Sequence, residues 1–255
     1  MELSSRELFE FLELKYEQYN QPEFVITDPV SVPHRFSRKE DIEIAGFMTA
    51  TISWGNRVSI VKNAGKLLDL MGNSPFEFIV NFTQQDVLRF QTFCHRTFNG
   101  TDCIFFLNSL QSIYRERRGL ESIFSPDKGE TLKEVICRFR QIFLLTNHPS
   151  RSEKHIANPD RGASSKRILM FLRWMVRRDK GGVDFGLWKN IPASALMCPL
   201  DVHSGNVARK LNLLSRKQND WKAVEELTAS LRRMDPEDPV KYDFALFGLG
   251  VFEHF

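Results

Sequence analysis

Two segments of the sequence each contain a side chain of a type that takes part in catalysis. Lys166 begins the run KRILMFLRW, and Asp201 follows 35 residues later in the pentapeptide PLDVH. A deprotonated lysine amine is a nucleophile, and a carboxylate stabilises positive charge that develops beside it. The competing interpretation is structural: Asp201 only caps a helix, which is worth about 1 kcal/mol, and Lys166 only starts one in solvent.

A second candidate lies at residues 52–57, ISWGNR, a sharp break between two apolar helical stretches. Trp54 can stack on a nucleobase, and Asn56 and Arg57 can hydrogen-bond to one or fill the gap that an extruded base leaves. The alternative is that Trp54 belongs to the core and that Gly55 and Asn56 end a helix.

The charge of the chain is unevenly distributed. The formal net charge is +3, but residues 151–217 hold 14 Lys and Arg against 5 Asp and Glu, so this segment carries +9 and the remainder −6. A surface of this kind attracts the phosphates of nucleic acids. The other interpretation is that these charges lie on solvated faces with no binding role. Arg177, Arg178 and Lys210 are expected on such faces.

The sequence gives no sign of several other kinds of site. The four cysteines, at positions 94, 103, 137 and 198, contain no C-x-x-C pair, which argues against a zinc ribbon, a redox pair or a compact iron–sulfur loop. The six histidines include no pair at helical ligand spacing. We therefore expect buried free thiols, no metal and no cofactor.

Helical periodicity and capping signals predict an all-α protein of about ten helices. Ser4 or Ser5, Ser37, Ser74, Asp201 and Asp220 (or Asn219) stand where helix caps are expected, and two further helices are expected to open at Thr101-Asp102 and at Thr131. Trp174, Trp188, Trp221 and Phe244 are expected in the core. No β-hairpin is predicted.

The organisation expected is a single two-lobed helical domain over residues 1–255. Its lobe boundary is expected in the polar loop near residues 147–165, and the N-terminal and C-terminal helices are expected to share a lobe. No apolar run approaches the ~18 residues of a membrane span. The first residues mix charges with apolar side chains, unlike a secretory signal, so a cytoplasmic location is expected.

Three longer patterns identify the chain as a member of an uncharacterised bacterial family of about this length. They are KRILMFLRWMVR at residues 166–177, PLDVH at 199–203 and DPVKYDFALFGLG at 238–250. The resemblance covers most of the chain.

The PLDVH segment, with VARKL at residues 207–211 behind it, resembles more distantly the signature of the helix-hairpin-helix DNA glycosylases. The resemblance implies a catalytic role for Asp201, and the archaeal 8-oxoguanine glycosylases are the closest analogy for Lys166 as the nucleophile. The chain departs from the glycosylase pattern at residues 159–166, PDRGASSK. Most glycosylases have a glycine-rich hairpin there, and this chain keeps one glycine. The expected fold is therefore glycosylase-like with an atypical hairpin.

The function that the resemblance implies is that of a base-excision glycosylase, with lyase activity, acting on a flipped damaged base in duplex DNA. Arg167 and Arg173 would favour the neutral, reactive form of the Lys166 amine. The residues expected to contact nucleic acid are Trp54, Asn56, Arg57, Arg167, Arg173, His203 and Arg209. Two alternatives stay open: a non-catalytic nucleic-acid-binding module with the same fold, and a protein-interaction scaffold.

Overall fold

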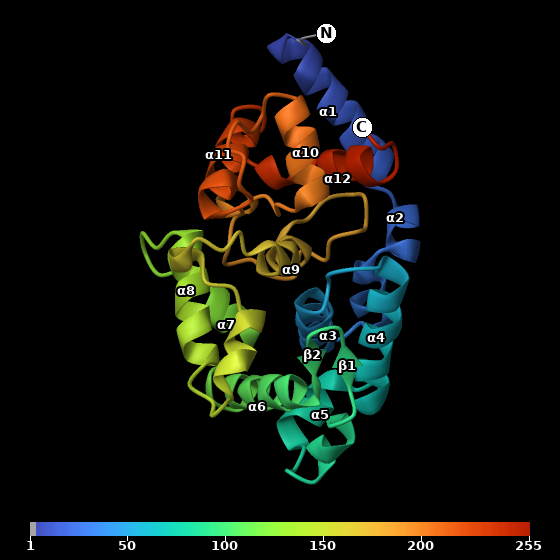
Figure 1. Cartoon of the computed structure of the whole chain (residues 1–255), viewed down its shortest axis with the longest axis vertical. Helices are drawn as coiled ribbons and strands as arrows, with labels where there is room; N and C mark the ends of the chain where they lie inside the picture. The colour runs from blue at the N-terminus through green and yellow to red at the C-terminus, as the bar shows by residue number, and fades with distance from the viewer. Residues whose placement is uncertain (1–3) are drawn as a thin grey trace. The chain divides into compact units, whose positions relative to one another are not determined.

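The computed structural model of the chain describes residues 4–255 and is predominantly helical (Figure 1). Within this range twelve α-helices follow one another: α1 Ser5–Tyr19, α2 Pro22–Thr27, α3 Lys39–Thr51, α4 Arg57–Leu70, α5 Pro75–Asn81, α6 Gly100–Glu116, α7 Leu120–Phe124, α8 Leu132–Phe143, α9 Lys166–Val176, α10 Val202–Lys210, α11 Trp221–Arg232 and α12 Asp243–Val251. Short 3₁₀-helices lie at Pro29–Ser31, Pro33–Arg35, Asp86–Phe90, Ser150–His155, Pro159–Arg161, Ala193–Ala195 and Pro239–Tyr242. The all-α prediction is confirmed.

Most of the predicted capping residues begin helices as expected. Ser4, Thr131 and Asp201 each accept a backbone N–H of the first turn and form reciprocal capping boxes. The prediction for Ser37 is wrong, because α3 starts at Lys39 with Arg38 as its N-cap and no side-chain capping bond. Ser37 therefore lies one residue too early to serve the orphan N–H groups of that helix.

A small β-hairpin, absent from the sequence prediction, precedes α6. Strands β1, Cys94–His95, and β2, Phe98–Asn99, pair antiparallel. The turn between them places Arg96 at a φ of 54°, a conformation that usually calls for Gly or Asn. Two-residue strands are too short to produce an alternating pattern, and the usual turn residues are missing.

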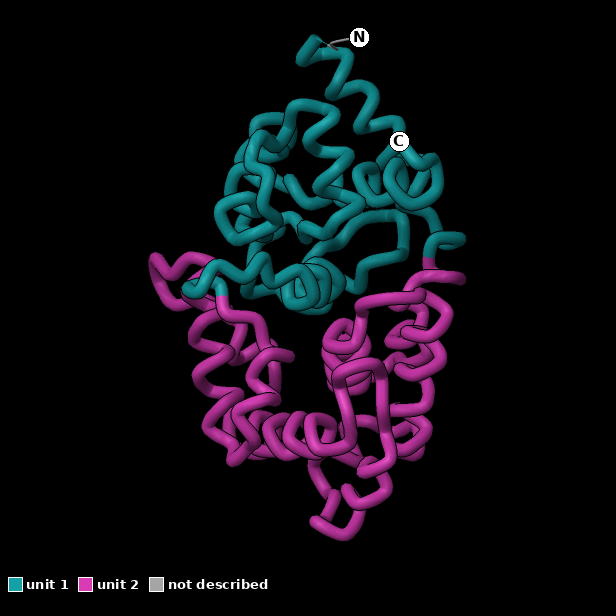
Figure 2. Tube along the Cα trace, in the orientation of Figure 1, with its two compact units in different colours: residues 1–24, 159–255 teal, residues 25–158 magenta. Residues whose placement is uncertain are grey.

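The chain divides into two compact units, coloured in Figure 2. The central unit is Val25–Asn158. The terminal unit combines the chain up to Phe24 with Pro159–Phe255, so both ends of the chain belong to it. The terminal unit contains the Lys166 and Asp201 segments, and the central unit contains the segment around Trp54.

Phenylalanine side chains form the core of the central unit. The ring of Phe47 in α3 lies 6.0 Å from Phe106 in α6 and 5.7 Å from Phe139 in α8, centroid to centroid. Phe143 completes the cluster at 4.9 Å from Phe106. All four side chains are buried, so three helices far apart in sequence meet on one aromatic cluster.

The terminal unit is built around α12, which packs against both α1 and α10 (Figure 1). Gly248 permits the close approach of α1, because a Cβ there would lie 2.1 Å from Cδ2 of Tyr19. Trp174, Trp188 and Phe244 are buried in this unit as predicted, as is Trp221.

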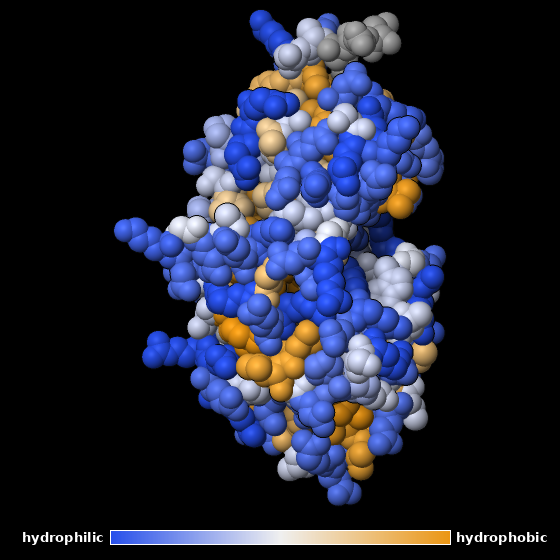
Figure 3. All heavy atoms as spheres, turned by 60° about the vertical axis from the view of Figure 1, so that its left-hand side comes forward, coloured by the Kyte–Doolittle hydropathy of each residue, from blue (hydrophilic) through white to orange (hydrophobic). Residues whose placement is uncertain are grey.

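The surface mixes polar and apolar residues. On the face shown in Figure 3, hydrophilic residues predominate and hydrophobic ones gather in separate small patches. Exposed apolar side chains include Ile26, Val58 and Leu145. In residues 4–255 no helix is both long enough and apolar enough to cross a membrane.

Candidate active site

Lys166 and Asp201 lie together in the terminal unit. Lys166 is the first residue of α9 and Asp201 is the N-cap of α10. The Nζ atom of Lys166 is 3.8 Å from Oδ2 of Asp201, and the two side chains are 27% and 26% exposed. The pair is therefore accessible to a molecule from solvent.

The two oxygens of Asp201 have different surroundings. Oδ1 accepts hydrogen bonds from the backbone N–H groups of His203, at 2.9 Å, and Ser204, at 3.0 Å. Oδ2 faces the Lys166 amine. One carboxylate thus caps α10 and pairs with the amine, so the capping and chemical interpretations of Asp201 are compatible.

The segment before Lys166 is a compact turn tied to α11. Gly162 has a φ of +85°, and a Cβ added to it would meet nothing within 4 Å. Its carbonyl accepts a hydrogen bond of 3.0 Å from the backbone N–H of Trp221. Ser165, at a φ of 55°, is buried and donates through Oγ to the carbonyl of Ala163. This turn, at the place of the expected hairpin, fixes where α9 and Lys166 begin.

Arg173, one α9 residue expected to act on Lys166, is buried and shared by two carboxylates. Its Nη1 donates to Oδ2 of Asp243 at 2.5 Å, and its Nε donates to Oδ1 of Asp184 at 3.2 Å. Because these carboxylates compensate its charge, Arg173 does not supply the uncompensated positive charge that was expected to favour the neutral amine.

Asp243 is the buried carboxylate of this group. Burial raises the pKa of Asp243 to about 6, a rise that the nearby charge of Arg173 opposes and that of Asp201 increases. Burial also raises the pKa of the neighbouring Cys198 thiol well above its usual range. The site therefore has one carboxylate at its surface and one beneath it.

Arg177 was expected on a solvated face, and this expectation is wrong. The residue is fully buried, and its guanidinium donates to Asp238 at 2.8 Å, to Asp184 at 3.1 Å and to the hydroxyl of Tyr16 at 2.8 Å. An ion pair with Asp179 adds to the cluster. Four partners satisfy a charge that burial alone would make very costly.

Sequence reasoning missed the acidic members of this network. Asp238 and Asp243 stand within the third family pattern, DPVKYDFALFGLG, but 61 and 70 residues from the arginines that they bind. The available signal was the presence of two aspartates at the N-terminal end of a helix predicted to be apolar. Asp184 is also buried and joins Arg173 to Arg177.

The other terminal-unit residues expected at a nucleic-acid surface differ in their surroundings. Arg167 is half-buried, and desolvation lowers the pKa of its guanidinium to about 10. His203 is exposed on the first turn of α10. Arg209 donates to the carbonyls of Arg216 and Lys217, so its guanidinium holds the loop that follows α10.

In the central unit, the break at Trp54 is a short link from α3 to α4. Asn56 is the N-cap of α4, accepting from the backbone N–H of Ser59 at 3.1 Å, and so it begins a helix instead of ending one. Trp54 is half-buried, with His95 edge-on at 5.1 Å and His155 stacked at 6.0 Å. Arg57, the first residue of α4, is also half-buried.

The same part of the central unit contains a fully buried carboxylate, Asp102. Arg151 Nη1 lies 3.1 and 3.0 Å from its two oxygens, Ser152 Oγ donates to Oδ1 at 2.6 Å, and His155 Nε2 lies 3.4 Å from Oδ2. Burial alone would raise the pKa of Asp102, but hydrogen bonds from Ser152 and Asn99 and the neighbouring positive charges outweigh burial and lower it.

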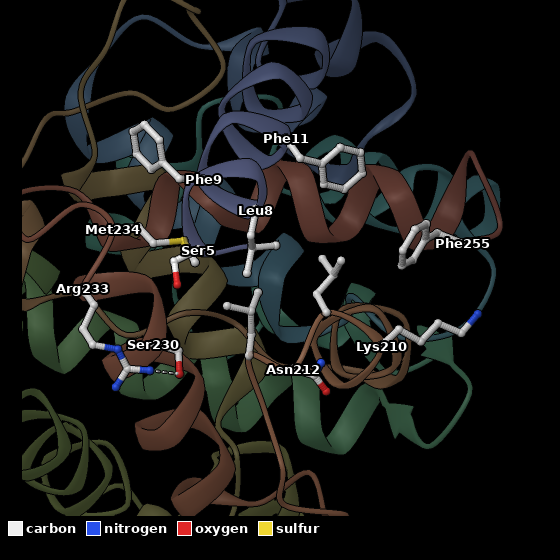
Figure 4. Close-up of a pocket in the computed structure, with 12 residues that line it drawn as sticks. Ser5, Leu8, Phe9, Phe11, Lys210, Asn212, Ser230, Arg233, Met234 and Phe255 are labelled. Carbon is white, nitrogen blue, oxygen red and sulfur yellow. Dashed lines mark hydrogen bonds between the residues drawn. The ribbon is translucent and has the colours of Figure 1, made fainter. Parts of the chain in front are cut away.

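The terminal unit also has a hollow of about 790 Å³ that is distinct from the Lys166–Asp201 pair (Figure 4). Phe9 and Phe11 from α1 and the terminal Phe255 give it apolar walls, and Lys210 and Arg233 stand at its edge. Neither Lys166 nor Asp201 lines it. The candidate active site thus rests on the geometry of the pair itself. No group of three or more His, Cys, Asp or Glu within residues 4–255 is placed to hold a metal ion.

A family model described as a protein of unknown function (DUF2400) matches residues 28–252, which include both the central segment around Trp54 and the Lys166–Asp201 pair. No curated protein and no solved structure shows a significant match to the chain.

Proposed function

The chain belongs to the DUF2400 family, whose function is unknown, and we propose that this member is a DNA glycosylase-like enzyme that excises a damaged base with Lys166 and Asp201. The observation that carries the proposal is the distance of 3.8 Å between the Lys166 amine and the Asp201 carboxylate, with both side chains about a quarter exposed. A nucleophile and an anionic stabiliser are thus available to the same ligand.

In the proposed reaction the neutral Lys166 amine attacks C1′ of an extruded nucleotide. The C1′–N bond to the base breaks, and the base leaves with the bonding electron pair and takes up the proton that the attacking nitrogen gives up. The Asp201 carboxylate stabilises the positive charge that develops on the sugar. Opening of the sugar ring then gives an imine between Lys166 and C1′, and this imine permits elimination of the 3′ phosphate, which is the lyase step.

Fixed donors support the role assigned to Asp201. The backbone N–H groups of His203 and Ser204 hold Oδ1, so the carboxylate keeps its orientation while Oδ2 remains toward the amine. Such preorganisation is the usual source of electrostatic catalysis. On the amine side, the compact turn from Gly162 to Ser165 fixes the start of α9.

The residues assigned to nucleic acid are considered for each unit by itself. Exposed cations of the basic segment are suited to phosphates: Lys154, Arg161, Arg178, Lys180 and Lys217. Trp54, Asn56 and Arg57 are assigned to the extruded base or the gap it leaves. Internal ion pairs occupy Arg173, Arg177 and Arg216, so the attraction for DNA is weaker than +9 would suggest.

Borohydride trapping tests the chemistry. The protein is incubated with duplex oligonucleotides that carry oxidised purines or abasic sites, and sodium borohydride reduces any imine to a stable amine. We expect a covalent complex that Lys166→Ala abolishes and that Lys128→Ala, which removes an exposed lysine outside the basic segment, preserves. The proposal is overturned if the parent protein forms no covalent complex with any of these lesions.

A non-catalytic nucleic-acid-binding module is the second candidate. The observation in its favour is that the Asp201 contacts already account for a helix cap and an ion pair, with no catalytic role needed. Affinity for undamaged duplex DNA should fall steeply with salt through counterion release. Absence of binding even at ~50 mM salt, where phosphate contacts are strong, would exclude both candidates and favour a protein-interaction scaffold.

A further inference from the structure

Segment 219–221, at the start of α11, is bound to the backbone on both sides of the candidate active site. Nδ2 of Asn219 donates a hydrogen bond of 2.9 Å to the backbone carbonyl of Asp201. Two residues later, the backbone N–H of Trp221 donates a hydrogen bond of 3.0 Å to the carbonyl of Gly162, in the turn that precedes α9. Three consecutive residues thus connect the start of α10 with the start of α9.

The connection to the turn before α9 is made by backbone atoms. Beside the bond from Trp221, the backbones of Ala163 and Asp220 pair in an isolated antiparallel bridge. The Trp221 side chain is buried and anchors the segment in the terminal unit. A change of side chain at Asn219 therefore leaves this half of the connection in place, whereas the half that reaches Asp201 depends on the Asn219 amide.

The Asn219 amide has a fixed orientation. Its Oδ1 accepts a hydrogen bond of 2.6 Å from Nη2 of Arg209, and its Nδ2 donates to the Asp201 carbonyl. An arginine only donates and a carbonyl only accepts, so the amide cannot be turned over without losing both bonds. Arg209 is itself held in place, because its guanidinium also donates to the carbonyls of Arg216 and Lys217.

Gly205 in α10 leaves the space that these two side chains occupy. A Cβ added to Gly205 would lie 2.9 Å from Nη1 of Arg209 and 3.0 Å from Oδ1 of Asn219. Glycine is a poor helix former, and the close approach of the guanidinium and the amide gives it a reason here. The backbone of α10, the Arg209 guanidinium and the Asn219 amide are therefore packed together beside Asp201.

We propose that Asn219 is a positioning residue of the Lys166–Asp201 pair. It holds the Asp201 backbone to the same short segment that holds the turn before Lys166, and so it keeps the carboxylate within reach of the amine. Because the bond is made to the carbonyl of Asp201, Oδ1 keeps its capping bonds and Oδ2 stays toward the amine. The catalytic meaning of this positioning rests on the proposed function, but the positioning itself needs no DNA.

The test is a zero-length cross-link within the pair. A carbodiimide activates the Asp201 carboxylate, the Lys166 amine displaces the activated oxygen, and an amide joins the two side chains while a urea leaves. Mass spectrometry of a digest compares this pair cross-link with a reference cross-link between Lys241 and Glu13, an ion pair of 2.8 Å in the same unit. We expect both cross-links in the parent.

Asn219→Asp is the informative variant, because it keeps an acceptor for Arg209 but has no N–H for the Asp201 carbonyl. The pair cross-link should fall about two- to tenfold relative to the parent, which is the population change that loss of one hydrogen bond allows, and the reference cross-link should stay constant. Asn206→Asp, at an exposed position of α10, introduces the same charge and should give both cross-links at the parent yield.

The proposal is overturned if Asn219→Asp forms the pair cross-link as well as the parent does, if the reference cross-link falls in parallel, or if the parent forms no pair cross-link. Gly205→Ala covers the case in which Asn219→Asp does not fold. Alanine favours the helix, but its Cβ displaces the Arg209 guanidinium and the Asn219 amide, so the same selective fall is expected. An unchanged pair cross-link in folded Gly205→Ala also overturns the proposal.

Borohydride trapping of the same proteins separates this inference from the proposed function. A parent whose pair cross-link depends on Asn219 but that traps no DNA loses the proposed function only. A parent that traps DNA, with a pair cross-link that does not depend on Asn219, loses this inference only. Where both hold, Asn219→Asp should slow trapping by about the factor by which it lowers the pair cross-link.

Discussion

Asp201 and Asp102 both stand at helix starts, and both belong to capping boxes, yet their surroundings differ. Asp102 lies at the third position of α6 and is fully buried, with both oxygens bound by protein groups. Asp201 is the N-cap of α10 and is about a quarter exposed, with one oxygen toward backbone donors and the other toward Lys166. A carboxylate that takes part in a capping box is thus fully buried in one unit and accessible in the other.

A capping signal in the sequence therefore does not show whether the carboxylate has a structural or a catalytic role. What decides is the surroundings of the second carboxylate oxygen. In Asp102 Oδ2 is held by Asn99, Arg151 and His155, and in Asp201 Oδ2 faces an exposed amine. Substitutions at these positions should therefore separate stability from reactivity.

The largest effect on stability is expected at Asp102. Asp102→Ala removes the partner of Arg151, Ser152 and the buried His155 and should lower the free energy of unfolding by about 3–5 kcal/mol. Asp201→Ala removes mainly a helix cap and should cost about 1 kcal/mol. Urea denaturation followed by circular dichroism measures both. Equal losses in the two variants would contradict the contrast between a sealed and an accessible carboxylate.

Asp243, a third carboxylate at a helix start, should make stability depend on pH. Its pKa is raised to about 6 in the folded protein, so the folded state binds this proton more tightly than the unfolded state. The resulting stabilisation is complete only below the unfolded pKa of about 3.9 and is lost as pH rises through 6, a change of about 2 kcal/mol between pH 4 and pH 7.

The measurement is the free energy of unfolding of the parent minus that of Asp243→Asn at several pH values. This difference should fall from pH 4 to pH 7. Asp220→Asn is the control with the opposite sign, because Arg216 lowers the pKa of Asp220 to about 2 and its contribution is lost as pH falls toward that value. A difference for Asp243→Asn that is independent of pH would show that the carboxyl titrates like an ordinary one.

The test of reactivity at Asp201 is the conservative exchange to asparagine. Asp201→Asn keeps a capping side chain but removes the negative charge, so the protein should stay folded while the rate of borohydride trapping falls about a hundredfold. Thr131→Ser, at the N-cap of α8 in the central unit, is a conservative exchange of a cap outside the terminal unit and should trap at the parent rate. If Asp201→Asn traps as fast as the parent, Asp201 is a cap and no more.

The smallest effect is expected at the α3–α4 link. Asn56→Asp preserves the cap of α4 and adds a negative charge, so stability should be unchanged while affinity for duplex DNA falls a few-fold. Asn56→Ala should instead lose about 1 kcal/mol of stability with the cap. Fluorescence anisotropy with labelled duplex measures the affinity. Unchanged DNA binding by Asn56→Asp would remove this link from the proposed nucleic-acid surface.

Local features of the fold could be predicted from the sequence because their causes are local. The caps Ser4, Thr131, Asp201 and Asp220 serve N–H groups two or three residues away. The prediction at Ser37 was wrong by one residue, since α3 starts one residue later than the capping pattern required.

Long-range pairing could not be predicted in this way. Nothing in the sequence near Arg177 shows that Asp238, 61 residues later, will share its burial, and an unpaired run of arginines looks like a solvated face. The same limit applies to the candidate site. The spacing of Lys166 and Asp201 does not imply contact, and their proximity was expected only through the family resemblance.

The discontinuous terminal unit has a consequence for the order of synthesis. Helix α1 is translated long before α12, on which it packs, and the ion pair from Lys15 to Glu253 joins residues 238 positions apart. The whole of the central unit, Val25–Asn158, is therefore made before the partner of α1 exists. A nascent chain that stops short of α12 lacks Asp243 and the surface on which α1 packs, so the unit that holds Lys166 and Asp201 reaches its complete form only after α12 has been made.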